Sequence, residues 1–358
     1  MREDDMRREP IYVLPPFKER PVLVPLTQQA GYQINLLGIQ DIWKTTSGEG
    51  VKVAVLDTGI VPHPDLDGAI LDAIDFSNSR YGVADLQGHG TFCAGEIAAR
   101  DNTIGVVGVA HKSKVLVGKV LGDNGSGAST TVARGIRWAI DKGADIISMS
   151  LGSPQPDPQL EAAIRDAIAA NVIVVAAAGN DGKKPFDTVN YPARYPGVIS
   201  VGAIDKNQKV TDFSARGKRV DIMAPGKDIT GCWPPRGYST LSGTSMAAPL
   251  VAAIIALLLA KYRMHGGDIP PITPDQVLMN LRQNAVDLGD PGFDTDYGFG
   301  MIDPDKLMLL ANPPPPPPPV GGVLNSLDLG PDDLTESGKA KVRQFLGKDT
   351  AAQISFQL

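Results

Sequence analysis

The sequence has little cysteine, little net charge and no apolar run long enough to cross a membrane. Its 358 residues contain only two cysteines, Cys93 and Cys232, and neither lies in a paired motif that binds metal or cycles a disulfide. A net charge of -6 gives no reason to expect nucleic acid as a partner. The longest apolar run, residues 246–260, is shorter than the roughly 18 residues of a membrane span and contains an early proline. We therefore expect no membrane partner and a buried helix at this run.

The first 30 residues also lack the apolar core, about seven or more residues long, that defines a secretory signal peptide. Two cysteines outside any paired motif are most simply free thiols. Together these two absences predict a cytoplasmic protein.

Short apolar segments alternate with segments of helical spacing along the chain. A content of 42% hydrophobic and 21% charged residues is typical of a globular protein. Strands are expected at residues 51–56, 115–121, 146–151, 172–178 and 198–204, and helices at 131–142 and 159–170. Because strand and helix alternate, we predict an α/β fold with a doubly wound, mostly parallel central sheet flanked by helices.

Three short motifs carry side chains that can act together in nucleophilic catalysis. Ser245 follows Gly243 and Thr244 directly before the long apolar run, a pattern typical of a strand-to-helix junction. Taken alone, the pattern is also compatible with an ordinary helix cap. Asp57 ends a β-branched apolar run, and His89 lies between two glycines. A serine hydroxyl is a poor nucleophile until an imidazole removes its proton and a carboxylate fixes the tautomer of that imidazole. The combination therefore favours catalysis.

The order Asp57, His89, Ser245, with these flanking residues, resembles the subtilisin-like serine proteases over residues 39–310. The resemblance implies a serine endopeptidase in which Ser245 is the nucleophile, His89 the general base and Asp57 the acid that orients it. It also implies that Asn180, which ends an Ala-Ala-Ala-Gly-Asn segment, donates to the oxyanion. No catalytic cofactor is expected.

The same resemblance places a groove for polypeptide substrates. An extended peptide is expected to lie as an extra strand between two segments of the enzyme, Gly125, Ser126 and Gly127 on one side and Ser150, Leu151 and Gly152 on the other. The S1 pocket, which receives the side chain before the scissile bond, is expected to have Asn190 as its floor and a wall of Ala177, Ala178 and Gly179.

Two interpretations of Asn190 remain open. As a floor residue it makes the pocket shallow and polar, which predicts a preference for small or medium P1 side chains. Alternatively it points away and caps the turn before Tyr191 and Pro192.

Residues 1–27 are expected to form a short leader. Residues 11–17 resemble the leader of the intracellular subtilisins, which lies across the active site and keeps the protease inactive. Two prolines make this segment stiff and extended, which suits a strand laid in a cleft. The resemblance thus implies that the leader is the protein's own inhibitor, and that the protein forms a homodimer, as members of that group tend to do. A disordered tail is the alternative for the leader.

The resemblance further implies structural Ca²⁺. The high-affinity calcium site of the family matches Asp65, Arg100, Asn102, Ile104 and Val106, with side-chain oxygens from the aspartate and the asparagine and carbonyl oxygens from the rest. Either Gln28 or Gln29 is expected to complete it. A second, weaker site is expected to use Asp221 with the carbonyl groups of Ala193, Tyr195 and Val198.

The remaining features concern the chain's organisation. A catalytic domain over residues 28–311 is expected to be followed by a Pro-rich linker, 312–322, and a tail, 323–358, with one amphipathic helix at 334–345. The tail is a docking or oligomerisation segment, a second propeptide or disordered.

Cys93, four residues after His89, is either a buried packing residue or a thiol that reaches the back of the triad.

Two other functions are compatible with this reading. One is a dedicated processing protease with a narrow physiological substrate, and the other is a non-catalytic binding protein on the same scaffold. The second is disfavoured because none of the four chemical residues is missing. An esterase of the Gly-x-Ser-x-Gly type is excluded by the sequence around Ser245.

Overall fold

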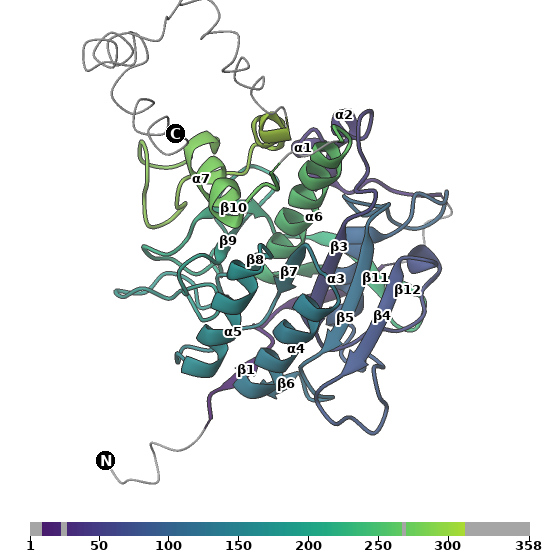
Figure 1. The fold of residues 1–358 in the computed structure, drawn as a ribbon. Helices are drawn as coiled ribbons and strands as arrows, with labels where there is room; N and C mark the ends of the chain where they lie inside the picture. The colour runs from purple at the N-terminus through teal and green to yellow at the C-terminus, as the bar shows by residue number, and fades with distance from the viewer. Residues whose placement is uncertain (1–8, 23–26, 267–269, 312–358) are drawn as a thin grey trace, which may run out of the picture. The chain divides into compact units, whose positions relative to one another are not determined.

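The computed structural model describes residues 9–22, 27–266 and 270–311. Its centre is a seven-stranded sheet in the order β10-β9-β8-β7-β3-β5-β4, with every neighbouring pair parallel (Figure 1). The strands are β3 (Lys52–Asp57), β4 (Ile70–Asp75), β5 (Lys114–Lys119), β7 (Ile146–Met149), β8 (Ile173–Ala177), β9 (Ile199–Ile204) and β10 (Ile222–Pro225). The predicted α/β class and parallel sheet are confirmed, and each of the five expected strands is present.

Helices cover this sheet. The longer ones are α3 (His89–Ala98), α4 (Ser129–Asp141), α5 (Pro158–Ala169), α6 (Thr244–Arg263) and α7 (Pro274–Asn284), and the short ones are α1 (Tyr32–Leu36), α2 (Ile39–Ile42), η2 (Pro64–Leu66), α8 (Pro304–Leu307) and η3 (Met308–Ala311). Helices α4 and α5 pack against each other, and so do α3 and α6. The start of α5 shows why these boundaries hold: Asp157 accepts hydrogen bonds from the next free backbone N–H groups, and Pro158 follows it.

Helix α6 is the core helix expected from the long apolar run. It is long and apolar enough to cross a membrane, but 94% of its most apolar window is buried inside the protein. It contacts strands β7, β8, β9 and β10. Burial of this kind identifies a core helix packed against the sheet, because its apolar side chains are already removed from water.

Two small antiparallel sheets involve the N-terminal segment. Strand β1 (Ile11–Val13) pairs with β6 (Ser126–Ala128), and β2 (Lys18–Val22) adds an edge to the hairpin of β11 (Ile229–Trp233) and β12 (Gly237–Ser242). Residues 11–13 and 18–22 therefore pair as strands with segments that follow later in the chain. The predicted linker, 312–322, and tail, 323–358, with the helix at 334–345, lie outside the described residues, as do residues 1–8 of the leader.

Candidate active site

The triad residues lie where a strand ends and two helices begin. Asp57 is the last residue of β3, His89 is the first of α3 and Ser245 is the second of α6. All three are fully buried. The Nδ1 atom of His89 lies 2.8 Å and 3.0 Å from the two carboxylate oxygens of Asp57. Because a carboxylate only accepts, Nδ1 carries the proton and Nε2 is left as a base.

The glycines beside His89 are required by close approaches. Gly88 has φ +83°, in the left-handed region, and a Cβ atom there would lie 2.8 Å from the ring of Trp233. A Cβ atom on Gly90 would lie 2.4 Å from the carbonyl oxygen of Gly59. The Gly-His-Gly motif thus lets the start of α3 approach the end of β3 closely.

Two reactive atoms are left without a partner. His89 Nε2 and Ser245 Oγ are buried, and neither forms a hydrogen bond with any of the residues that the structure describes. Buried polar atoms are rarely left unpaired in folded proteins, and those that are frequently mark a functional site. His89 Nε2 and Ser245 Oγ are therefore both available for hydrogen bonds with another group.

Asn180 follows β8 and points its amide nitrogen into the groove. Its Oδ1 atom accepts hydrogen bonds from the backbone N–H and the hydroxyl of Thr244, at 2.9 Å and 2.8 Å. Those two donors fix the orientation of the amide, so that Nδ2 is the free end. Nδ2 donates to the carbonyl oxygen of Pro16 at 2.8 Å. This is the geometry of a donor aimed at a peptide carbonyl.

The N-terminal segment occupies the predicted groove. Val13 exchanges two backbone hydrogen bonds with Gly152, and the N–H of Leu14 donates to the carbonyl of Gly125. The ring centroid of Phe17 lies 5.2 Å from that of His89. Of the predicted groove residues, Ser150 does not face this strand; its hydroxyl donates to the carbonyl of Ser245 at 2.9 Å. Leu151 is buried.

A cavity of about 570 Å³ lies beside Pro16 and is lined by Asn180, Asn190, Gly152 and further residues of the same loops. Asn190 therefore faces the cavity, and its Nδ2 donates to Asp181 at 3.1 Å. A Cβ atom on Gly179 would lie 2.6 Å from that nitrogen, so the glycine makes room for it. The three predicted wall residues, Ala177, Ala178 and Gly179, are buried, and none of them lines the cavity.

Oxygen atoms gather at the predicted calcium ligands. The carbonyl oxygens of Arg100 and Val106 and Oδ1 of Asn102 lie 2.7, 3.3 and 3.4 Å from the side-chain nitrogen of Gln28. Asn102 also contacts the buried carboxylate of Asp65 at 3.4 Å. Carbonyl, amide and carboxylate oxygens are the ligands that Ca²⁺ prefers, so these residues fit the ion.

Other members of the predicted set are placed less directly. Gln29 turns to Thr27 instead, which leaves Gln28 as the N-terminal member. The guanidinium of Arg100 is turned to the carbonyls of Gly68, His111 and Ser113, so that only its backbone faces the cluster. Ile104 is connected to the cluster through its N–H, which donates to Asn102 Oδ1.

Asp221, predicted to hold a second cation, is paired with an arginine in the structure. One of its carboxylate oxygens accepts from Nε and Nη2 of Arg282, at 3.0 Å and 2.7 Å, and the other accepts from the N–H of Ser200. A guanidinium thus already supplies the positive charge that a metal ion would supply. Without this carboxylate, only the backbone carbonyls of Ala193, Tyr195 and Val198 remain.

Cys93 is buried packing rather than a reachable thiol. Its sulfur lies 3.8 Å from His89 Nδ1 and 3.6 Å from the carbonyl oxygen of Ser245. Burial raises the pKa of the Cys93 thiol well above its usual range, with the nearby carboxylate of Asp57 adding to the effect. A thiol that stays protonated and covered is a poor nucleophile.

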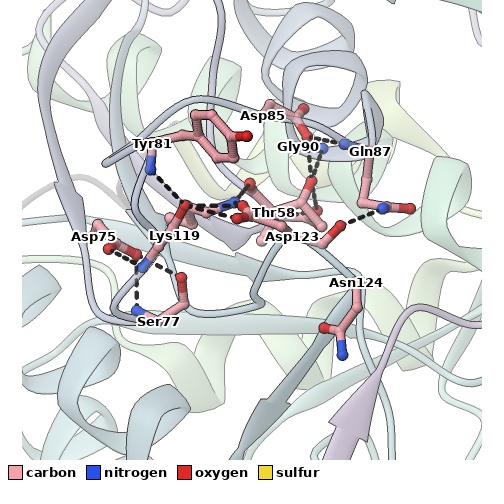
Figure 2. A network of polar contacts seen from close by, with 12 residues as sticks. Thr58, Asp75, Ser77, Tyr81, Asp85, Gln87, Gly90, Lys119, Asp123 and Asn124 are labelled. Atoms are coloured by element: carbon pink, nitrogen blue, oxygen red, sulfur yellow. Dashed lines mark hydrogen bonds and ion pairs between the residues drawn. The ribbon is translucent and has the colours of Figure 1, made fainter.

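The sequence analysis missed a polar network behind the triad, which Figure 2 shows. It connects Thr58, next to Asp57, with Asp85, Gln87, Lys119 and Asp123. The one signal available in the sequence is an aspartate four residues before His89, a position from which a side chain reaches the free N–H groups of the helix start.

Comparison with known proteins agrees with this geometry. Residues 48–300 match the model of the subtilase family. The chain belongs to the subtilase family. A thermostable alkaline protease of Halalkalibacterium halodurans is 41% identical over 285 residues, 79% of this chain and 75% of that protein.

Subtilisin DY of Bacillus licheniformis is 41% identical, over 72% of this chain and 90% of that protein. An intracellular serine protease of Paenibacillus polymyxa is also 41% identical, over 72% of this chain and 80% of that protein. The predicted family is confirmed, and the subtilase is a subtilisin-like serine endopeptidase.

Proposed function

We propose that Ser245 Oγ attacks the carbonyl carbon of the scissile peptide bond while His89 Nε2 takes its proton. Asp57 holds His89 in the required tautomer, and the imidazolium then returns the proton to the leaving amine. Water, activated by His89, releases the acyl group from the serine. The contact that carries the proposal is Asn180 Nδ2 to a bound peptide carbonyl at 2.8 Å.

This contact fits oxyanion stabilisation because the amide donor is held before any charge develops. Thr244 fixes its direction, so no reorganisation is needed during the reaction. We assign the second donor to the backbone N–H of Ser245. In subtilisin itself, removal of the oxyanion-hole asparagine costs about 10²–10³ in kcat.

Replacement of Ser245 by alanine tests the nucleophile. We expect Ser245→Ala to lose at least about 10⁴-fold in kcat on a fluorogenic peptide, because members of a triad act as a unit. Ser200→Ala is the matched control, since Ser200 is also fully buried with an unpartnered hydroxyl but lies on β9. Equal activity of wild type and Ser245→Ala would refute the proposed nucleophile.

We also propose that residues 9–22 act as an autoinhibitory leader. The segment pairs with both groove strands through β1, places its Pro16 carbonyl at Asn180 and continues as β2 along β12. Arg20 adds an exposed ion pair with Asp228 at 2.6 Å, worth at most about 1 kcal/mol. A substrate has to displace all of these contacts to reach Ser245.

Two prolines explain how such a segment escapes rapid cleavage. The bond held at Asn180 is Pro16–Phe17, and the residue before it is Pro15. Neither proline has an N–H group, and each has a fixed φ, so the chain cannot form the hydrogen bonds of an ordinary substrate strand there. Tight binding with poor alignment gives an inhibitor rather than a substrate.

Removal of the prolines should convert the leader into a substrate. We expect the full chain with Pro15→Ala and Pro16→Ala to lose its N-terminal segment at least about tenfold faster than wild type, because alignment alone is worth that much. Intact mass spectrometry over time measures the loss. Pro10→Ala, in the same leader but away from the bond, should keep the wild-type rate; a double variant that is no faster contradicts the role of the prolines.

For the S1 pocket we propose the floor role of Asn190, with small or medium P1 side chains preferred. Its amide enters the cavity beside Pro16 and is held there by Asp181. Asn190→Gly should raise the ratio of kcat/KM for P1 phenylalanine over P1 alanine about tenfold or more, since filled space in a pocket is worth roughly 1–3 kcal/mol. A wild type that already prefers phenylalanine tenfold over leucine and alanine contradicts this assignment.

We further propose that the Asp65 cluster holds structural Ca²⁺, with Gln28 turning its oxygen to the ion. A flip of the Gln28 side chain exchanges its amide nitrogen and oxygen. The amide oxygen can face the oxygens of Arg100, Asn102 and Val106 only when a cation lies between them. The ion would tie residue 28, just after the leader, to the loop at Arg100–Val106 and stabilise the fold by mass action.

Chelation tests this site in the Ser245→Ala protein, which cannot digest itself. Removal of Ca²⁺ should lower the melting temperature by about 5–10 °C, as expected when binding contributes roughly 2.7 kcal/mol. Asp65→Asn should have a low melting temperature that the chelator does not change. The melting temperature of Asp221→Asn should still fall when the chelator is added. Chelator-independent melting of the unaltered site would exclude the ion.

A further inference from the structure

Asp85 is a buried carboxylate that the proposed reaction does not use. It lies in the loop between β4 and α3 and is only 2% exposed. Five donors point at it. Oδ1 accepts from the Thr58 hydroxyl and the N–H groups of Gln87 and Gly88, at 2.8, 3.1 and 2.8 Å, and Oδ2 accepts from the N–H and the hydroxyl of Thr91, both at 2.8 Å. Figure 2 shows Asp85 with Thr58 and Gln87.

These donors belong to residues that are close in sequence to two members of the triad, His89 and Asp57. Gln87, Gly88 and Thr91 flank His89 at the first turn of α3, and Thr58 is the residue after Asp57. The carboxylate of Asp85 thus connects the end of β3 to the start of α3 through hydrogen bonds. The relative position of the His89 imidazole and the Asp57 carboxylate depends on these bonds, because each residue is one or two peptide units from a residue that donates to Asp85.

The Thr58 hydroxyl has a single proton and two carboxylates within reach. Its oxygen accepts from the N–H of Gly90 at 2.9 Å and lies 2.8 Å from Asp85 Oδ1 but 3.2 Å from Asp57 Oδ1. The shorter contact goes to Asp85, so the proton is directed there. Asp57 is then left to accept from the Thr58 N–H and from His89 alone.

Asp85 is held by hydrogen bonds and not by an ion pair. Among the described residues no lysine, arginine or histidine forms an ion pair with it; the fully buried Lys119 instead donates to the Thr58 carbonyl at 2.6 Å and pairs with Asp123 at 3.2 Å. The position of the Asp85 carboxylate is therefore set by the donors of Thr58, Gln87, Gly88 and Thr91.

We propose that Asp85 is a positioning residue of the triad: it fixes His89 against Asp57 and keeps the Thr58 proton away from Asp57. This role rests on the proposed function of Ser245, His89 and Asp57. Asp85 forms no hydrogen bond with the described part of the leader, which lies in the substrate groove and bonds to Gly125 and Gly152. Its effect should therefore appear in kcat and leave KM unchanged.

The variant Asp85→Asn, in the full chain at steady-state activity, tests the proposal. It keeps the size of the side chain but presents an NH₂ group to donors. We expect kcat per active site to fall roughly tenfold to hundredfold, as for a small misplacement of catalytic groups, with KM within about twofold. A fluorophosphonate that labels the reactive serine counts the active sites, so that loss of folded protein is separated from loss of rate.

A second variant separates positioning from general stability. Thr91→Val keeps the Asp85 carboxylate but removes one of the hydroxyls that anchor it, and should lose about threefold or more in kcat with KM unchanged. It also provides the test if Asp85→Asn does not fold, because unchanged kcat in Thr91→Val then overturns the proposal.

Asp75→Asn is the matched control. The carboxylate of Asp75 lies in the same network region and accepts from Ser77 and Ser79, but none of its partners is next to a triad residue. It should keep the wild-type kcat and KM. Wild-type values in Asp85→Asn, or an equal change in Asp75→Asn, would overturn the positioning role, whereas a wild type without serine-dependent turnover would instead contradict the proposed function.

Discussion

The parallel sheet brings the carboxyl ends of its strands to one edge, and the residues of the site are gathered there. Asp57 ends β3 and Asn180 follows β8, while His89 and Ser245 begin the two helices, α3 and α6, that pack against each other. Helix N-termini carry partial positive charge and free N–H groups, which suits an edge where an oxyanion forms. The site thus follows from the fold rather than from one flexible loop.

The leader depends on the same edge. Its described residues bury Tyr12 and Pro15 and pack Leu14, Phe17 and Val22 against the core. They also bind by backbone pairing, with β1 on one side of Pro16 and β2 on the other. A strand that uses the backbone contacts of the substrate groove competes with every peptide substrate, whatever its side chains. In the proposed autoinhibition its local concentration is high because it is part of the chain, so weak, exposed contacts suffice.

Much of the fold could be predicted because its signals are local. Apolar runs marked the buried strands, and small residues around Asp57, His89 and Ser245 marked close approaches. Strand β2, Lys-Glu-Arg-Pro-Val, escaped because it is exposed and becomes a strand only by pairing with β12. The pairing of Asp221 with Arg282, 61 residues away, also has no signal near it in the sequence. The Asp85 network escaped although Gln87, Gly88 and Thr91 are close in sequence, because its bond to Thr58 spans 27 residues.

The most direct test of a groove closed by its own leader is one time course on the wild-type full chain, with intact mass and turnover of a fluorogenic peptide recorded together. The account predicts little turnover at the start and a rise in step with loss of the N-terminal segment. Full turnover from the first seconds, with residues 9–22 still attached, would contradict it.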